Sequence, residues 1–136
     1  MPKDNGINVL IAEDDLEIAG ILRKTLAAEG YRIALAYDGE EALRSALAHK
    51  PDLIVLDVMM PQMNGWEVCK SLRARMEYND VGILMLTAIG PNLNEMTAPL
   101  YGADDHLDKP FMIPELLEKL AALALKKHKP AAGATA

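Results

Sequence analysis

The chain has 136 residues, which is the length of one domain and too short for two full hydrophobic cores. Its 51% apolar and 25% charged residues are typical of a soluble globular protein, and no apolar run approaches the ~18 residues of a membrane span or forms the core of a signal peptide. A net charge of −6 is the wrong sign for nucleic acid, and a single cysteine, Cys69, excludes an internal disulfide. We expect a cytoplasmic protein that contacts neither membranes nor nucleic acid.

Five short apolar runs have the length and residue types of β-strands. They cover residues 8–12, 31–36, 53–56, 82–86 and 106–108. The third run is apolar at every position, which is typical of a strand that is covered on both faces of its sheet.

Amphipathic segments separate these runs, and several carry the residues that begin or end helices. They predict a first helix from residue 16 to a C-cap at Gly30, a second from a capping box of Asp38 and Glu41 to about residue 49, and a third from a capping box of Asn64 and Glu67 to about residue 76. A fourth helix is predicted between 91 and 101. The last begins at Pro114, and its core face consists of Leu116, Leu117, Leu120 and Leu123.

Strict alternation of strands and helices implies an α/β domain, a doubly wound parallel sheet of five strands with helices on both faces. We place this domain at residues 1–129. Residues 130–136 have nothing to bury, so we expect a disordered tail or the start of a linker there.

Polar side chains stand where four of the predicted strands end. Glu13 and Asp14 follow the first strand, Asp57 the third, Thr87 the fourth and Lys109 the fifth. Ligands of open parallel sheets bind at the carboxyl ends of the strands. Clustered carboxylates repel one another unless a hard cation lies among them, and oxygen ligands suit Mg²⁺. A lysine and a hydroxyl beside them complete a phosphoryl site, with Asp57 as the predicted nucleophile.

Each of these residues also has a purely structural explanation. Asp14 with Glu17 has the spacing of a capping box for the first helix. Asp57 could merely end its strand, although a carboxylate directly after four apolar residues is costly to bury without a partner. Thr87 and Lys109, taken singly, are an ordinary strand residue and a solvated lysine.

Four strings carry the predicted site: IAEDD at 11–15, LDVMMP at 56–61 with Gly65, LTA at 86–88 and GADDHLDKPF at 102–111. In this order they resemble the receiver domain of two-component response regulators, over roughly residues 7–125. The resemblance implies a flavodoxin-like fold with strand order 2-1-3-4-5.

The same resemblance implies that a sensor histidine kinase or a histidine phosphotransfer protein phosphorylates Asp57 in the presence of Mg²⁺ or Mn²⁺. The implied metal ligands are Glu13, Asp14, Asp57 and the backbone carbonyl of Met59, with Asp14 the more direct ligand of the acidic pair. The implied output is a shift of the face built from the fourth helix, the fifth strand and the fifth helix, which controls a partner or an output domain. We expect a monomer, or a dimer that forms weakly on phosphorylation.

Further residues take their roles from this resemblance. Thr87 and Lys109 correspond to the residues that bind the phosphoryl group, and the Lys109–Pro110 bond is expected to be cis. Thr87 also belongs to the conformational switch, with His106 at the position where the family normally has Tyr or Phe.

Two apolar residues, Met59 and Ile89, correspond to positions that flank the path of water to the phosphoryl group. Neither side chain can orient a water molecule, so we expect the phosphoryl group to be lost slowly.

Two rival functions fit parts of the pattern. A small Mg²⁺-dependent phosphohydrolase would also use Asp57, but the best-known family of that kind has a second aspartate where this chain has Met59. A degenerate receiver that only docks partners would not need the acidic residues, Thr87 and Lys109 together. The sequence therefore predicts a signalling switch that catalyses its own phosphorylation and dephosphorylation, rather than an enzyme with a separate substrate.

Overall fold

The computed structural model describes residues 4–87 and 102–127, with a parallel five-stranded sheet at its centre in the order β2-β1-β3-β4-β5. The strands are β1 (Asn8–Ala12), β2 (Arg32–Ala36), β3 (Leu53–Asp57), β4 (Gly82–Thr87) and β5 (Asp105–Asp108). The helices are α1 (Leu16–Ala28), α2 (Gly39–His49), α3 (Gly65–Arg73) and α5 (Ile113–Lys127), with a short 3₁₀ helix, η1 (Met76–Tyr78). The predicted fold class and strand order are confirmed, whereas the helix predicted between 91 and 101 lies outside the described residues.

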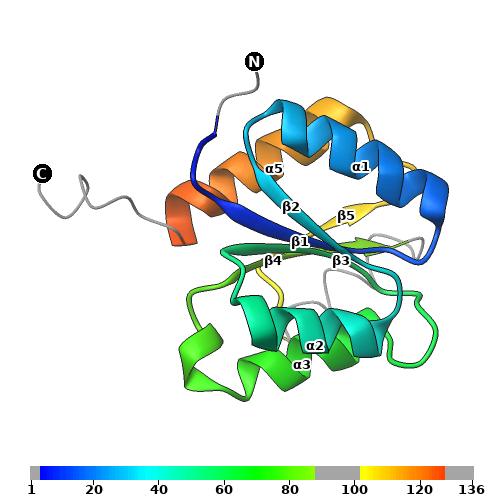
Figure 1. Cartoon of the computed structure of the whole chain (residues 1–136), viewed down its shortest axis with the longest axis vertical. Coiled ribbons are helices and arrows are strands. Elements are labelled where there is room, and N and C mark those ends of the chain that lie inside the picture. The colour runs from blue at the N-terminus through cyan, green and yellow to red at the C-terminus, as the bar shows by residue number, and fades with distance from the viewer. Residues whose placement is uncertain (1–3, 88–101, 128–136) are drawn as a thin grey trace, which may run out of the picture.

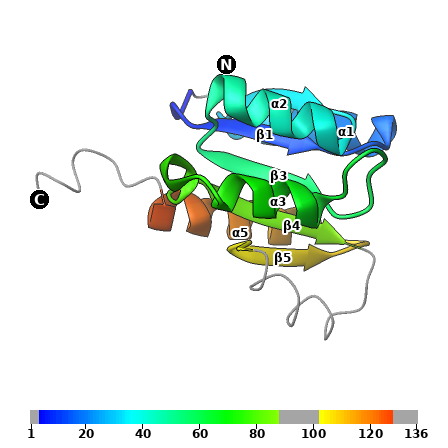
Figure 2. The same cartoon turned by 90° about the horizontal axis from the view of Figure 1, so that it is seen from below.

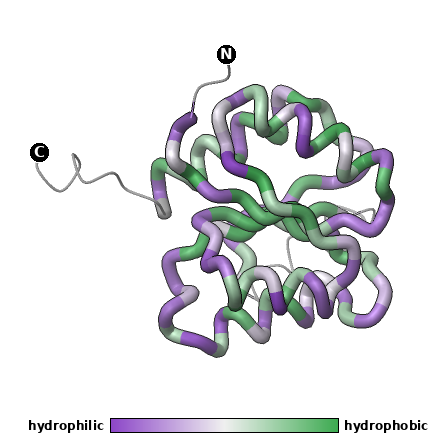
Figure 3. Tube along the Cα trace, in the orientation of Figure 1, coloured by the Kyte–Doolittle hydropathy of each residue, from purple (hydrophilic) through white to green (hydrophobic). Residues whose placement is uncertain are grey.

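Helices cover both faces of the sheet, α1 and α5 on one face and α2 and α3 on the other (Figure 1). Along β3, Leu53 and Val55 belong to the apolar layer of α1 and α5, while Ile54 and Leu56 belong to that of α2 and α3. All four side chains are fully buried, which explains why this strand has no polar face. The hydrophobic colouring accordingly runs through the central strands, and it alternates with polar residues along the helices (Figure 3).

The N-cap of the first helix differs from the alternative in which Asp14 and Glu17 form a capping box. Asp15 is the N-cap of α1, because its carboxylate accepts hydrogen bonds from the backbone N–H groups of Glu17 at 2.9 Å and Ile18 at 3.1 Å. The capping box of Asp14 and Glu17 is therefore wrong. Asp14 does not cap the helix, and its exposed side chain lies just beyond the end of β1.

The two other predicted capping boxes differ from each other. Asn64 and Glu67 form a complete box, in which each side chain accepts a hydrogen bond from the backbone N–H of the other residue. Asp38 accepts from the N–H of Glu41 at 2.8 Å, but the Glu41 carboxylate accepts in return from the N–H of Tyr37 at 2.6 Å. The return bond thus reaches the residue before the cap.

Helix α3 ends at Arg73, before the predicted end near residue 76. The Arg73 guanidinium donates hydrogen bonds to the carbonyl oxygens of Tyr78 at 2.5 Å and Gly102 at 2.8 Å, and to the carboxylate of Asp104 at 2.8 Å. Gly102 has a φ of +90°, and a Cβ there would lie 2.5 Å from Cγ of Arg73, so glycine is required. We call Arg73, Tyr78, Gly102 and Asp104 the Arg73 cluster.

The helix faces predicted to be apolar are only partly buried. On α5, Leu116, Leu120 and Leu123 are buried as predicted, and Leu117 is partly buried. On α1, however, Leu16 is 70% exposed and Ile21 is 52% exposed. These two residues have helical spacing with the buried Leu22, but spacing alone does not show whether the core reaches them.

The single cysteine, Cys69, lies on α3 and is fully buried in the layer between α3 and the sheet. Burial of the thiol raises the pKa of Cys69 to about 12. None of the helices within the described ranges, 4–87 and 102–127, is both long and apolar enough to span a membrane.

Candidate functional site

The parallel sheet brings the predicted site residues to one edge. Glu13 and Asp14 directly follow β1, Asp57 is the last residue of β3 and Thr87 is the last residue of β4. The arrows of β1, β3, β4 and β5 point the same way, so these strand ends lie at the same side of the sheet (Figure 2). Lys109 follows β5, and its backbone N–H donates to the carbonyl oxygen of Thr87 at 2.7 Å.

Three carboxylates form a group at this edge. Oxygen atoms of Glu13, Asp14 and Asp57 all lie within 4.8 Å of one another, and this is the only group of its kind found in the described part of the chain. Glu13 is 1% exposed and Asp57 is 3% exposed, whereas Asp14 is exposed. Hard oxygen donors at this spacing fit a magnesium ion. We call Glu13, Asp14, Asp57 and Lys109 the carboxylate site.

One ammonium group lies among these acids. Nζ of Lys109 is 2.8 Å from Oε1 of Glu13 and 3.3 Å from Oδ2 of Asp57. The other oxygen of Glu13 accepts a hydrogen bond from the backbone N–H of Asp15 at 3.2 Å. Both oxygens of Glu13 therefore have protein partners, which leaves Asp14 as the acid of the pair that is more available to a cation.

The proton affinities at the site reflect this crowding. Burial raises the pKa of Glu13, and the nearby charge of Asp57 raises it further, while the hydrogen bond from Lys109 opposes both effects. Desolvation and the neighbouring carboxylate of Glu13 also raise the pKa of Asp14. Burial disfavours the Lys109 ammonium, but its bonds to Glu13 and Asp57 outweigh this, and the pKa of Lys109 is raised. Burial, together with the neighbouring carboxylates, therefore favours the protonated form of these two acids more than Lys109 favours the charged form.

The loop after β3 is fixed under Asp57 by backbone contacts. The N–H of Met59 donates to Oδ1 of Asp57 at 3.3 Å, and the N–H of Gly65 donates to the carbonyl oxygen of Val58 at 2.9 Å. A Cβ on Gly65 would lie 2.4 Å from the carbonyl oxygen of Asp57. Gly65 is therefore a site-supporting residue that the chemistry of side chains alone does not reveal.

The other predicted site residues that the structure describes lie on or next to β4 and β5, and they differ in solvent exposure. Thr87 is 1% exposed at the end of β4. His106 lies on β5, paired in register with Met85, and is partly exposed. The Lys109–Pro110 peptide bond is cis. Ile89 lies outside the described residues, so its predicted place beside Met59 stays a prediction.

An apolar groove of about 520 Å³ adjoins the carboxylate site. Its lining comes from α1 and from the segment that leads into α5, namely Ile18, Ile21, Leu22, Lys109, Pro110, Phe111 and Ile113. The exposed side chains of Leu16 and Met112 lie on the same two segments. Helical spacing looks the same whether an apolar face meets the core or a groove, so the sequence does not distinguish these two settings for the α1 residues.

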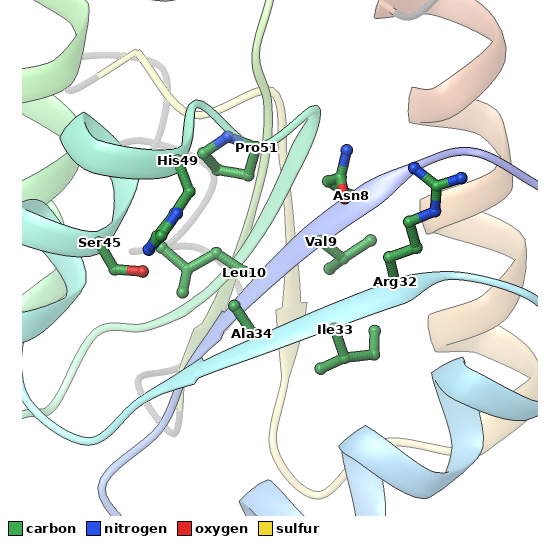
Figure 4. Close-up of a pocket in the computed structure, with 9 residues that line it drawn as sticks. All are labelled: Asn8, Val9, Leu10, Arg32, Ile33, Ala34, Ser45, His49 and Pro51. Carbon is green, nitrogen blue, oxygen red and sulfur yellow. The ribbon is translucent and has the colours of Figure 1, made fainter.

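A second hollow, of about 220 Å³, lies at the opposite end of the sheet (Figure 4). Ser45 and His49 of α2 stand on one side of it, Arg32 stands on the other, and Leu10 and Ala34 lie between them. It shares no residue with the carboxylate site, so His49 has no part in that chemistry.

The fold and the carboxylate site define a class of protein: a flavodoxin-like α/β domain with an acidic pocket and a lysine at the carboxyl edge of its sheet. The family model of the response regulator receiver domain matches residues 9–121, and the chain belongs to this family of two-component signalling proteins.

Named relatives and solved structures agree with this assignment. The chain is 44% identical over 125 residues to the response regulator MprA of Mycobacterium bovis BCG, which covers 91% of this chain and 53% of the relative. The chain thus spans about half the length of the curated relatives that it matches. The receiver domain of the Francisella response regulator 1452 superposes with a TM-score of 0.82 at 33% identity, covering 88% of this chain and 98% of that one.

A third similar protein is relevant to the metal. The receiver domain of the sensor histidine kinase PA1611 of Pseudomonas aeruginosa superposes with a TM-score of 0.76 at 30% identity, covering 87% of this chain and 94% of that chain. That structure has a magnesium ion coordinated in its active-site cleft.

Proposed function

We propose that this chain is a phosphorylation-activated switch in which Asp57 accepts a phosphoryl group from a histidine kinase or a histidine phosphotransfer protein. The observation that carries the proposal is the setting of Asp57. It is a buried carboxylate at a strand end, within 4.8 Å of two further acids and 3.3 Å from an ammonium group. This is a receptor for a divalent cation and a phosphoryl group on the same carboxylate.

In the transfer step, an oxygen of Asp57 forms a bond to phosphorus while the bond between phosphorus and the donor's imidazole nitrogen breaks. The nitrogen keeps the electron pair, and the product on Asp57 is an acyl phosphate. Mg²⁺, or Mn²⁺ in its place, would be held by Glu13, Asp14, Asp57 and the Met59 carbonyl, with Asp14 the more direct ligand of the acidic pair, and would neutralise negative charge on the phosphoryl oxygens.

Lys109 has to change partners during this step. Its ammonium is shared between Glu13 and Asp57, and the incoming phosphoryl oxygens offer it a stronger anion than the carboxylate that they modify. The bond to Glu13 keeps the ammonium within reach while this happens. Thr87, which is buried at the end of the neighbouring strand, would bind another phosphoryl oxygen and pass the change toward His106 on β5.

The phosphodonor protein would bind at the apolar groove. Lys109 lines the groove and also lies 3.3 Å from Asp57, so a protein seated there reaches the phosphoacceptor. Ile21, 52% exposed on α1, offers apolar contact area on this surface. We expect Ile21→Glu to slow transfer from a phosphorylated donor protein about tenfold, equivalent to ~1.4 kcal/mol, and to leave labelling by acetyl phosphate unchanged. Equal slowing with both donors would exclude docking at this groove.

Incubation with acetyl phosphate, with and without Mg²⁺, followed by intact mass measurement, tests the function itself. A receiver gains one phosphoryl group only when Mg²⁺ is present. A phosphohydrolase consumes acetyl phosphate without keeping the group, and a docking module ignores it. Either of the last two results would refute the proposal.

We also propose that residues 1–129 form the receiver and that 130–136 are a tail or the start of a linker. The match covers 53% of the relative's length, which is consistent with a further domain as the output of such a switch. A separate partner protein is the other possible target. Limited proteolysis of the chain tests the boundary, since cleavage confined to the region beyond residue 129 is the expected result.

A further inference from the structure

Three methionines lie in the loop between β3 and α3, and only one of them is open to solvent. Met59 is 64% exposed, Met60 is 8% exposed, and Met63 is partly buried against the apolar layer of α2 and α3. A soluble oxidant can therefore reach the thioether of Met59, while the neighbouring Met60 is shielded.

The exposed methionine adjoins the phosphoacceptor. Its backbone N–H donates to Oδ1 of Asp57 at 3.3 Å, and the Asp57 carboxylate is otherwise buried, with 3% of the residue exposed. A chemical change in the side chain of Met59 therefore takes place two residues along the chain from the phosphoacceptor. Met112, which lies beside the groove, and Met76 are also strongly exposed, at 71% and 85%. Met76 lies on η1 beyond the end of α3 and makes the matched control away from the site.

Oxidation by a peroxide transfers one oxygen atom to the thioether sulfur, which gives the sulfoxide and leaves water or an alcohol from the peroxide. The sulfur loses two electrons, and the peroxide O–O bond is reduced. The product is a polar group with a strong hydrogen-bond acceptor oxygen, and thiol-dependent sulfoxide reductases reverse the change. At position 59 this replaces an apolar side chain, unable to orient water, with one that can.

We propose that Met59 is a reversible oxidation site for peroxides, and that its sulfoxide shortens the lifetime of the phosphoryl group on Asp57. The inference rests on the proposed function, because it concerns the decay of the phosphorylated state. Because Met59 is two residues from Asp57 and its backbone contacts that carboxylate, the sulfoxide oxygen would accept a hydrogen bond from a water molecule close to the phosphoryl group. The switch then resets faster under oxidising conditions.

Peptide mass mapping after brief treatment with hydrogen peroxide tests the modification without any phosphorylation. We expect oxygen addition at the exposed residues Met59, Met76 and Met112, and none at Met60 or at Met85, which is 1% exposed. A Met59 that stays unmodified while Met76 is oxidised would overturn the proposal.

Loss of the phosphoryl group over time, measured before and after peroxide, tests the consequence. We expect a several-fold faster loss in the wild type and in Met76→Leu, and no response to peroxide in Met59→Leu. Met59→Gln, which carries an amide oxygen in place of the sulfoxide oxygen, should lose the group faster than Met59→Leu without any peroxide.

The two proposals fail in different ways. A chain that never retains a phosphoryl group refutes the proposed function and this inference together. A chain that retains the group, but loses it at the same rate when Met59 is oxidised, refutes only the inference.

Discussion

Two partly buried ionic groups lie at opposite ends of the sheet, and they differ in charge balance although each has an ion pair of the same length. The Arg73 cluster has an ion pair of 2.8 Å between Arg73 and Asp104, and the carboxylate site has one of 2.8 Å between Lys109 and Glu13. In the Arg73 cluster one guanidinium meets one carboxylate, and its other donors bind carbonyl oxygens. In the carboxylate site three carboxylates share one ammonium.

This difference separates a structural ion pair from a functional one. A balanced pair with complete hydrogen bonding stabilises the fold without needing a ligand, whereas excess negative charge in a buried group costs stability until a cation or a reaction removes it. The length of the ion pair is the same in both groups, although Glu13 is more deeply buried than Arg73 or Asp104. The two groups differ most clearly in the number of charges of each sign, and substitutions that change this number test the comparison.

The largest expected effect is at Asp57. Replacing Asp57 with Asn should abolish Mg²⁺-dependent phosphorylation and leave the fold intact, because the amide keeps the shape of the side chain and removes the nucleophilic oxygen. Intact mass after acetyl phosphate treatment measures this, with circular dichroism to check the fold. Asp80→Asn, an exposed aspartate outside both groups, is the control and should label fully. Full labelling of Asp57→Asn would show that the nucleophile lies elsewhere.

The second effect is on stability, at the other end of the sheet. Arg73→Leu leaves Asp104 buried without its cation, and we expect a loss of about 3 kcal/mol in the free energy of unfolding. Urea unfolding measures it. Adding Asp104→Asn to Arg73→Leu should cost less than the sum of the two single changes, because the pair is removed together. A loss below about 0.5 kcal/mol for Arg73→Leu would mean that the cluster is no more stabilising than a surface ion pair.

The third prediction is a gain in stability rather than a loss. Removing a charge from the carboxylate site, by Asp14→Asn, should raise the melting temperature of the metal-free protein by about 2–4 °C, since it relieves repulsion. Mg²⁺ should raise the melting temperature of the wild type by mass action and have little effect on this variant. Glu13→Gln should give no such gain, because Glu13 is the partner of Lys109. A wild-type melting curve that ignores millimolar Mg²⁺ would count against the site.

The smallest effect is a dependence on pH. The pKa values of Glu13 and Asp14 are raised above their ordinary values of 4.5 and 3.8, so the folded protein holds these protons more tightly than the unfolded chain. Their contribution to stability is therefore most favourable below the ordinary values and is lost as pH rises through the raised ones. Without metal, the stability advantage of Asp14→Asn should grow between pH 4 and pH 7. An advantage that is constant with pH would contradict this origin.

Local sequence rules predicted most of the fold. Each strand lies within about one residue of its predicted span, because apolar runs bounded by polar or turn residues depend on nearby sequence. The errors arose where distant residues decide. Arg73, the last residue of α3, bonds to Gly102 and Asp104, which are distant in the sequence, and the exposure of Ile21 depends on how far the core extends.

The sequence predicted which residues form the carboxylate site, but not which of these residues pair with each other. Strand ends placed Glu13, Asp14, Asp57 and Lys109 together, since the carboxyl ends of parallel strands share an edge. The choice of Glu13 as the closest partner of Lys109, and of Asp15 rather than Asp14 as the helix cap, depends on side-chain geometry. No spacing rule distinguishes neighbouring acids that are chemically alike.

The burial of Cys69 has a practical consequence for labelling experiments on this chain. A thiol with a pKa of about 12, in a side chain that is fully buried, carries almost no thiolate at neutral pH and gives reagents little access. It is also the only cysteine in the chain. A cysteine introduced on the surface, for example Ala121→Cys on α5, should therefore take up a maleimide dye selectively in the otherwise native sequence. A fluorescent reporter on that helix could follow the switch in real time.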